Sequence, residues 1–375
     1  MITVREVKTS RDIKEFIEFP LRIYKKCPYF VPPLYSDEKK LLLSGGNTEN
    51  AESVFLLALN EKGETVGRIH GIIEKQYNKN HNTLKGRFTR FDAIDSDEVA
   101  AALFKELEKW AKSKGMTEIC GPLGFNDLNR EGLLVDGFSE DSTFEEQYNY
   151  EYYGKLLENV GFRKDVDWVE YELRLPEKRN GMLKRVAERA LEINRLHVAD
   201  TNLSKRKYIA KYRDSFFECL DICYRHLYGT VDLTKEVQDE LVSQFNLIVN
   251  KKYVIFICDE NDRVVAFGVC FPAIGDAIKK SGGRLTPSAL FKILRLVKKP
   301  KVIDLGLVAV LPEYQNSGIN AVMIDRMLEL LEKEGIEKYE TNLNLETNDA
   351  VRAQWKYFNA RQHKRRRSYI KEIGE

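Results

Sequence analysis

The sequence has few of the features that mark metal-binding, secreted or membrane-spanning proteins. Its six cysteines include no Cys-x-x-Cys pair, so neither a zinc knuckle nor a disulfide framework is indicated, and reduced thiols in a cytoplasm fit best. Residues 1–10 contain no apolar signal core, and the longest apolar run, at 264–271, is far too short to span a bilayer. We therefore expect a cytoplasmic protein with no bound metal and no membrane partner.

Charge is also nearly balanced. A formal net charge of +2 over 375 residues gives no reason to expect a nucleic-acid partner. Locally, basic residues gather near the C-terminus at 361–367 and again at 298–301. Two interpretations stay open for these clusters: they are solvated strand edges that discourage edge pairing, or they face the phosphates of a nucleotide-like cofactor or an acidic substrate.

The most informative segment is 311–320, which lies between a strand pattern and a helix pattern. Residues 301–310 alternate as a β-branched strand, and apolar residues recur at helical spacing from Val322 as far as Gly335. A polar, glycine-containing loop in this position presents unpaired backbone N–H groups and the positive end of a helix dipole to an anion. The alternative is a simple polar connection without a ligand.

This segment resembles the pyrophosphate loop of GNAT-type acyl-CoA transferases, written Gln/Arg-x-x-Gly-x-Gly/Ala. Gln315 and Gly318 match that pattern, and Asn320 departs from it at the last position. A Walker loop or a Rossmann turn would need other residues. The resemblance implies acetyl-CoA, or another acyl-CoA, as the cofactor, with pantetheine along the strand. The cofactor-binding residues that it implies are Val308, Val310, Gln315, Asn316, Ser317, Gly318, Ile319, Asn320 and Asn348.

The order of elements is repeated along the chain. Each half has a β-hairpin, a further strand, a long amphipathic helix that ends at Gly115 or Gly335, and then a strand, a helix and a closing strand. Proline, glycine and charge interrupt the pattern at 175–181. This order is similar to that of tandem GNAT proteins. We expect an α/β fold of two tandem GNAT-like domains, 1–176 and 182–375, each a mixed, mostly antiparallel sheet flanked by helices.

The two halves differ where the cofactor loop would lie. In the first half, Ser96 caps the helix among the carboxylates of Asp95, Asp97 and Glu98, which would repel a pyrophosphate. The first domain is therefore expected to be a substrate or structural half. Its connection at 121–138 is longer than usual, and is either a clamp between the domains or a substrate wall. The predicted substrate residues are Asn126, Glu131, Tyr148 and Tyr152.

Acyl transfer from a thioester to an amine needs a base, an N–H donor for the developing oxyanion and an acid for the thiolate. The resemblance gives the N–H role to Val308 or Val310, where a bulge opens the strand. By strict alternation Asp304 shares a face with these two residues, and Glu340 lies on the adjacent strand. Either carboxylate is a candidate base.

The acid is harder to assign. The family commonly has a tyrosine two helical turns after an asparagine, but Trp355 occupies that spacing after Asn348. Tyr357 is the remaining candidate, although two residues along a helix lie on nearly opposite sides. Elsewhere, Cys219, Cys223 and His226 share a helical face, and we interpret them as core-facing residues rather than as zinc ligands. His70 is the lone histidine of the strand at 67–73, and we interpret it as packed or solvated.

The expected function is acyl-CoA-dependent N-acyl transfer, most simply N-acetyl transfer, onto a small or peptide-like amine bound between the domains. One alternative is a non-catalytic acyl-CoA or metabolite-binding protein, which the missing tyrosine allows. Another is a Fem-like transferase that uses aminoacyl-tRNA, with the basic clusters on the acceptor stem. The sequence does not define the acceptor, the acyl length or the oligomeric state.

Overall fold

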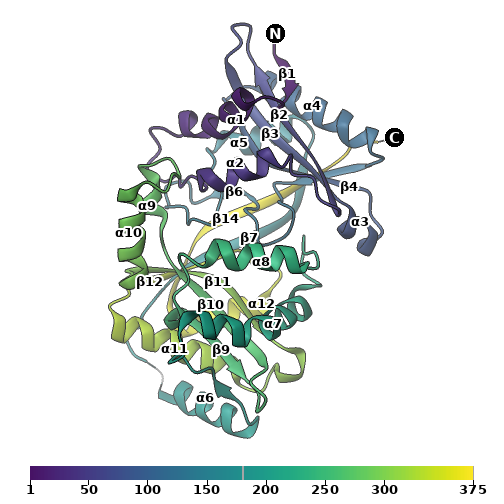
Figure 1. Cartoon of the computed structure of the whole chain (residues 1–375). Helices are drawn as coiled ribbons and strands as arrows, with labels where there is room; N and C mark the ends of the chain where they lie inside the picture. The colour runs from purple at the N-terminus through teal and green to yellow at the C-terminus, as the bar shows by residue number, and fades with distance from the viewer. Residues whose placement is uncertain (180, 375) are drawn as a thin grey trace. The chain divides into compact units, whose positions relative to one another are not determined.

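The computed structural model describes residues 1–179 and 181–374, which form two compact units (Figure 1). The first unit comprises Met1–Val169, Gly275–Ala289 and His363–Glu375, and the second comprises Glu170–Ile274 and Leu290–Gln362. The predicted limits, 1–176 and 182–375, follow the sequence repeat rather than these contacts, and stay a prediction.

The sheet of the first unit has the strand order β1-β2-β3-β4-β5-β14, and β6 also pairs with β14. Among the described residues of this sheet, β4 and β5 pair parallel and the other pairs named here are antiparallel. Helix α4 packs closely on β3, because a Cβ atom on Gly71 would lie 2.3 Å from Leu107 Cδ1. The elements are β1 Thr3–Glu6, α1 Ser10–Ile23, α2 Tyr35–Leu43, β2 Ala51–Leu59, β3 Thr65–Glu74, α3 Lys75–His81, β4 Lys85–Ala93, α4 Asp97–Ser113, β5 Glu118–Gly121, β6 Leu133–Asp136, α5 Tyr152–Asn159 and α9 Gly275–Lys279.

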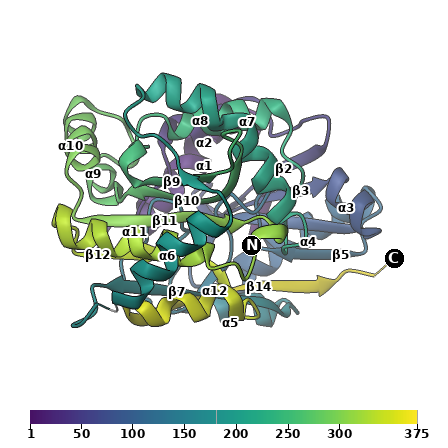
Figure 2. The same ribbon diagram turned by 90° about the horizontal axis from the view of Figure 1, so that it is seen from below.

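The described part of the second unit's sheet has the strand order β8-β9-β10-β11-β12-β7, in which β11 and β12 are parallel and the other neighbours are antiparallel. Figure 2 shows α7 and α8 on one side of β9–β11, and α6 and α11 on the other. The remaining elements of the chain, of which β7, α10 and β14 belong partly to the first unit, are β7 Arg163–Arg174, α6 Gly181–Ile193, β8 His197–Val198, α7 Lys205–Tyr224, α8 Lys235–Phe245, η1 Lys251–Tyr253, β9 Val254–Cys258, β10 Val264–Pro272, α10 Pro287–Lys298, β11 Val302–Val310, η2 Pro312–Tyr314, α11 Ile319–Glu334, β12 Lys338–Thr341, β13 Asn344–Leu345, α12 Asp349–Arg352, η3 Ala353–Tyr357 and β14 Asn359–Glu372.

The closing strand of each sequence half joins the sheet that is formed mainly by the other sequence half. The end of β7 pairs with β12, where Leu173 lies opposite Tyr339. The end of β14 pairs with β5, where Tyr369 lies opposite Gly121. Both sheets are nevertheless mixed and mostly antiparallel with flanking helices, which confirms the predicted fold class. Of the helices in the described residues, none has the length and apolar character needed to cross a bilayer.

Candidate functional site

One edge of β11 opens halfway along the strand. Its first part, Val302–Leu305, runs parallel to Lys338–Thr341 of β12, and the N–H of Asn342 donates to the carbonyl of Leu305 at 3.0 Å. In the described part of the chain the register with β12 ends there, whereas the register with β10 continues to Val310. The second half of β11 therefore has one edge on which an extended ligand could add as a strand.

A bulge at Gly306 marks the start of this open edge. Val269 of β10 pairs with Leu307, and its neighbour Cys270 pairs with Leu305, so Gly306 is the extra residue. Cross-strand partners share a face of the sheet, and consecutive residues of β10 lie on opposite faces. Leu305 and Leu307 consequently lie on opposite faces. The strand bulge that the family resemblance implies is present at this position.

The bulge decides the face on which the first candidate base lies. Asp304 lies opposite Phe271, and Val308 lies opposite Gly268, which is three residues from Phe271 and therefore on the other face of β10. Val310 shares the face of Val308. The expectation that Asp304 shares a face with Val308 and Val310 is wrong, because strict alternation fails at a bulge.

The two candidate bases belong to a row of carboxylates across three strands. Asp304 pairs with Glu340 on β12, which pairs with Glu172 on β7, and all three side chains are buried. The ammonium of Lys338 lies 2.9 Å from Glu172 Oε2 and also contacts Glu340. Although burial opposes it, hydrogen bonds from Arg174 and Lys338 lower the pKa of Glu172 to about 2. Glu172 is thus a fixed negative charge, which leaves Asp304 and Glu340 as possible proton acceptors.

A phenol from α7 lies on the open edge of β11. The hydroxyl of Tyr224 is 3.3 Å from both the backbone N–H and the backbone C=O of Val308, so it accepts from one and donates to the other. Both backbone groups of a residue in a strand point to the same side, here toward the open edge. Sequence reasoning missed Tyr224 because it is the last residue of α7 and lies 84 positions before Val308 in the chain.

The loop after β11 has the backbone geometry of an anion cradle. Asn316 has φ +62° and Gly318 has φ +86°, and Gly318 is the N-cap of α11 without any side-chain capping bond. Alternation of right- and left-handed residues turns successive N–H groups toward one point, which the dipole of α11 makes positive. A Cβ atom on Gly318 would also lie 3.2 Å from the Cβ of Ala190 and 3.5 Å from Val186, both in α6. Glycine is therefore required by conformation and by space.

The predicted cofactor residues around this cradle have different parts in it. Gln315 donates its side-chain amide to the carbonyl of Val310 at 3.2 Å, and Ser317 donates its hydroxyl to the carbonyl of Tyr314 at 2.5 Å. These side chains hold the loop in shape. Ile319 is buried, so its backbone alone faces the cradle, whereas Asn316 and Asn320 are exposed.

The helix that the sequence pattern predicts before the closing strand of the second half, at 350–358, is only partly α-helical. One α-helical turn, α12, is followed by the tighter 3-10 helix η3. The Asn348 side chain caps α12 by accepting from the N–H of Val351 at 3.3 Å. Trp355 is buried and donates its indole N–H to Asn344 at 3.3 Å. Tyr357 is half-buried on η3, and its role as acid, like the pantetheine contact of Asn348, stays a prediction.

The first unit has a similar strand opening that its own side chains fill. The register of β3 with β4 also shifts, and Arg90 in the bulge has φ +49°. Beyond it, the N–H of Ala93 donates to the hydroxyl of Tyr153 at 3.1 Å, and its carbonyl accepts from Tyr152 at 2.7 Å. The following helix α4 is capped by Ser96 and begins with two acidic residues. The absence of a pyrophosphate site in this half stays a prediction, which the acidic start of α4 favours.

Three of the four predicted substrate residues of the first unit have hydrogen-bond partners within it. Tyr152 bonds Ala93 as described, and Tyr148 donates its hydroxyl to the carbonyl of Phe138 at 2.9 Å. Asn126 accepts from the N–H of Leu128 at 3.0 Å. Glu131 is buried, and burial raises its pKa well above the usual value. A role in substrate binding for Asn126, Glu131, Tyr148 and Tyr152 stays a prediction.

The C-terminal basic cluster is an internal ion-pair network. Lys364 and Arg366 are fully buried and lie 2.7 Å and 3.2 Å from Glu146 Oε2. Arg365 and Arg367 lie 3.0 Å and 2.8 Å from the carboxylate of the buried Asp167. These four residues are therefore neither a solvated edge nor a phosphate-facing patch, because carboxylates of the first unit already neutralise them.

Glu145, next to this network, makes the stability of the first unit depend on pH. Its Oε1 is buried and has no hydrogen-bond partner in the described residues. Burial raises its pKa to about 7, although the charge of Arg130 opposes the shift. In the unfolded chain this carboxyl has its ordinary pKa of 4.5, so between about pH 4.5 and 7 the folded protein holds a proton that the unfolded chain has released. Stability is therefore expected to fall as pH rises from about 4.5 to 7.

We expect Glu145→Gln to remove most of this pH dependence, because an amide does not titrate. The difference between the free energies of unfolding at pH 5 and pH 8, measured by urea denaturation, should shrink by up to about 3 kcal/mol. The exposed Glu151 offers the matched control, and Glu151→Gln should leave the difference unchanged. Equal pH profiles for wild type and Glu145→Gln would contradict the expectation.

Two groups of side chains were not assigned to the site from the sequence: His70, and Cys219 with Cys223 and His226. His70 is fully buried, stacks on Phe55 with ring centroids 4.0 Å apart, and lies 3.1 Å from the Ser53 hydroxyl. Burial lowers its pKa well below the usual range, so it is neutral. Cys219 is buried, whereas His226 is exposed beyond the end of α7. Among the described residues, no group of three histidine, cysteine or acidic side chains is arranged to hold a metal ion.

Comparisons with known proteins define the class. Residues 213–358 match the Acetyltransferase (GNAT) family. A tandem GNAT protein from the clavulanic acid biosynthesis pathway has the same fold, with a TM-score of 0.57 at 10% identity over 100% of this chain and 99% of that chain. The protein therefore has the tandem GNAT fold, and its residues 213–358 are similar to the GNAT family of acyltransferases, whose members generally bind acyl-CoA. The resemblance inferred from Gln315 and Gly318 is confirmed.

Two relatives match along nearly their whole length. Protein YghO of Escherichia coli (strain K12) is 28% identical over 377 residues, which cover 99% of this chain and 95% of that protein. The bacterial ceramide synthase of Caulobacter vibrioides (strain NA1000 / CB15N) is 26% identical over 364 residues, which cover 93% of this chain and 92% of that protein.

Proposed function

We propose that the protein transfers an acyl group from acyl-CoA to the nitrogen of an amine, with the second unit as the catalytic domain. The observation that carries this proposal is the open edge of β11, which leads directly into the Gly318 cradle at the start of α11. An extended pantetheine fits the edge, and a pyrophosphate fits the backbone N–H groups of the cradle, whose left-handed turn at Gly318 a side chain would strain and crowd against α6.

The residues of this edge have the chemical groups that the reaction needs. Acyl-CoA, when bound, supplies an activated acyl carbonyl. The N–H of Val308 would donate to the oxygen of that carbonyl as negative charge develops on it. Asp304 or Glu340 would accept the proton that the attacking amine loses. A ligand that takes over the N–H of Val308 displaces the hydroxyl of Tyr224, which then lies beside the thioester and can protonate the departing thiolate.

The relatives favour a long-chain amine as a second candidate for the acceptor, beside the small or peptide-like amine expected from the sequence. A ceramide is an amide of a long-chain amino alcohol, and the similarity to the bacterial ceramide synthase covers 93% of this chain. The aminoacyl-tRNA alternative has lost its main support, because Lys364–Arg367 are paired with Glu146 and Asp167.

Two measurements on the purified chain test the proposal. Calorimetry should show CoA binding, and free thiol should appear only when acyl-CoA and an amine are both present. The acyl donors should range from acetyl to palmitoyl, and the amines from a short polyamine or peptide to a long-chain amino alcohol. Binding without thiol release would favour the non-catalytic alternative. No binding of CoA by the folded chain would refute the acyl-CoA proposal altogether.

A further inference from the structure

Helix α10 carries an apolar stripe on its exposed side. Leu290, Phe291 and Leu294 are 37%, 70% and 52% exposed, whereas Ala289 and Ile293 on the other side of the helix are buried. Residues three and four apart are neighbours on a helix surface, so Leu294 lies beside both Phe291 and Leu290 and the three exposed side chains form one strip. Large apolar side chains gathered in this way on a surface mark an interaction site rather than ordinary scattered exposure.

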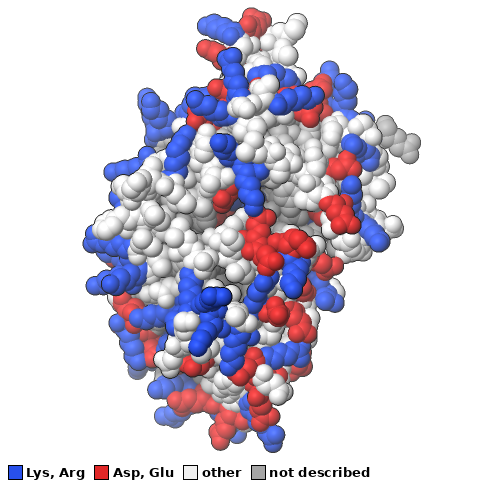
Figure 3. Space-filling view, in the orientation of Figure 1, with Lys and Arg blue, Asp and Glu red and all other residues white. Residues whose placement is uncertain are grey.

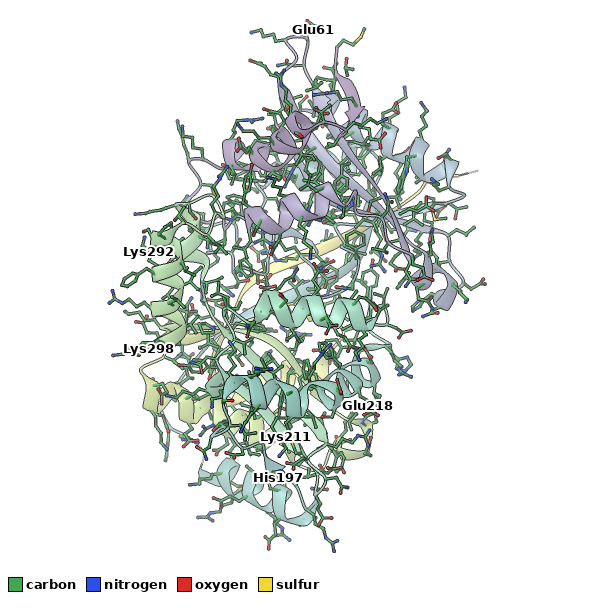
Figure 4. The ribbon with its side chains drawn as sticks, viewed as in Figure 1. Glu61, His197, Lys211, Glu218, Lys292 and Lys298 are labelled. Atoms are coloured by element: carbon green, nitrogen blue, oxygen red, sulfur yellow. The ribbon has the colours of Figure 1, made fainter. Side chains whose placement is uncertain are left out.

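Positive charge surrounds this stripe. The exposed residues Lys292, Arg295, Lys298 and Lys299 lie on or directly after α10, and no acidic residue occurs from 287 to 301. Within residues 1–179 and 181–374, none of these four cations takes part in an ion pair, whereas Lys301 pairs with Glu337 at 2.8 Å. Figure 4 shows Lys292 and Lys298 projecting outward from α10, and Figure 3 shows basic side chains beside uncharged surface there.

We propose that α10 docks on the surface of an anionic phospholipid bilayer. Leu290, Phe291 and Leu294 would enter the boundary between headgroups and acyl chains, and the four cations would lie against the headgroup phosphates. A helix with apolar residues on one side and lysine and arginine beside them lies in the plane of such an interface without spanning it. This proposal departs from the expectation of no membrane partner, which rests on the absence of a spanning segment.

The charge pattern favours a bilayer over a second copy of this chain. Self-association through α10 would bring eight like charges together, with only three apolar side chains per copy to offset their repulsion. That strip is small beside the roughly 800 Å² per partner of a stable protein interface. An anionic surface instead attracts every one of the cations. The inference uses no property of the β11 edge, so it stands or falls independently of the proposed acyl transfer.

Co-sedimentation of the full chain with vesicles, without CoA or amine, tests the proposal. We expect binding to vesicles of phosphatidylcholine with 30% phosphatidylglycerol, little binding to pure phosphatidylcholine, and a decrease in binding with added salt. Lys292→Glu/Lys298→Glu should weaken partitioning at least about 25-fold, because each basic residue near the surface contributes about a factor of five. Phe291→Glu should also abolish most of the binding.

Matched controls separate docking from general charge and exposure. Lys105→Glu/Lys112→Glu on α4 changes the net charge by the same amount, and Ile193→Glu replaces a side chain that is 66% exposed on α6, close to the 70% of Phe291. Both controls should bind like wild type. The proposal is overturned if the wild-type chain does not bind the anionic vesicles, or if the α10 variants and the controls bind them equally. Concentration-dependent dimerisation that Phe291→Glu abolishes would also overturn it.

Discussion

Replacement of Tyr224 by phenylalanine is expected to lower kcat for amine-dependent thiol release by about 100-fold, with little change in KM for acyl-CoA. The hydroxyl is 3.3 Å from the N–H and C=O of Val308, at the point where the thioester would lie. Its loss removes a proton donor for the leaving thiolate without changing the cradle at Gly318. The fold should persist, because the ring remains and the two hydrogen bonds lost contribute roughly 2 kcal/mol together.

Tyr357→Phe is the informative partner of this experiment, since Tyr357 is the acid that sequence spacing suggests. We expect it to leave kcat nearly unchanged, because Tyr357 lies on η3 beside Lys356, whose ammonium is 5.3 Å from its ring. A large loss of kcat in Tyr357→Phe with none in Tyr224→Phe would reverse the assignment. A lower KM for acyl-CoA with unchanged kcat in Tyr224→Phe would instead show that the hydroxyl only competes with the ligand for the strand edge.

The sequence predicted those parts of the site that depend on local patterns. The strand, glycine loop and helix at 302–334 appear as expected, because alternation, turn residues and helical spacing are properties of neighbouring residues. Trp355, which the sequence left without a role as an acid, has a structural place, since its indole is buried and donates to Asn344.

Other features depend on contacts between distant segments. Alternation alone gave Asp304 the wrong face, because the bulge at Gly306 appears only in the register with β10. The tyrosine at the end of α7 has no local signal that connects it to Val308. Likewise, a run of basic residues such as 364–367 looks the same in sequence whether it is solvated or paired with buried carboxylates.

The exchange of closing strands has the same origin. A strand pattern predicts that β7 and β14 exist, but it contains no information on which neighbour each will choose. Because β7 ends beside β12 and β14 ends beside β5, each compact unit contains chain from both sequence halves. A fragment cut at 176 would therefore lack the last strand of its own sheet, so experiments on this protein should use the full chain.

Gly318→Glu is expected to weaken CoA binding by about 100-fold or more, measured by titration calorimetry. Gly318 has φ +86°, where a side chain costs about 1 kcal/mol, and its Cβ atom would crowd Ala190 at 3.2 Å. The added carboxylate would also bring a negative charge to the loop that is proposed to hold the pyrophosphate. Two unit charges about 5 Å apart at an effective dielectric constant of 20 repel by about 3 kcal/mol, which corresponds to about 100-fold in affinity.

Gly335→Glu separates this electrostatic effect from backbone strain. Gly335 ends the same helix with φ +67°, and a Cβ atom there would meet nothing within 4 Å. Both variants should lose stability to urea from the positive φ, Gly318→Glu more than Gly335→Glu because only Gly318 is also crowded, while Gly335→Glu keeps wild-type affinity for CoA. Gly318→Ala should fall between them, because it adds strain and crowding without charge. If Gly318→Glu folds and binds CoA as tightly as Gly335→Glu, the pyrophosphate does not bind at the N-terminus of α11, and the cradle is only a connection between β11 and that helix.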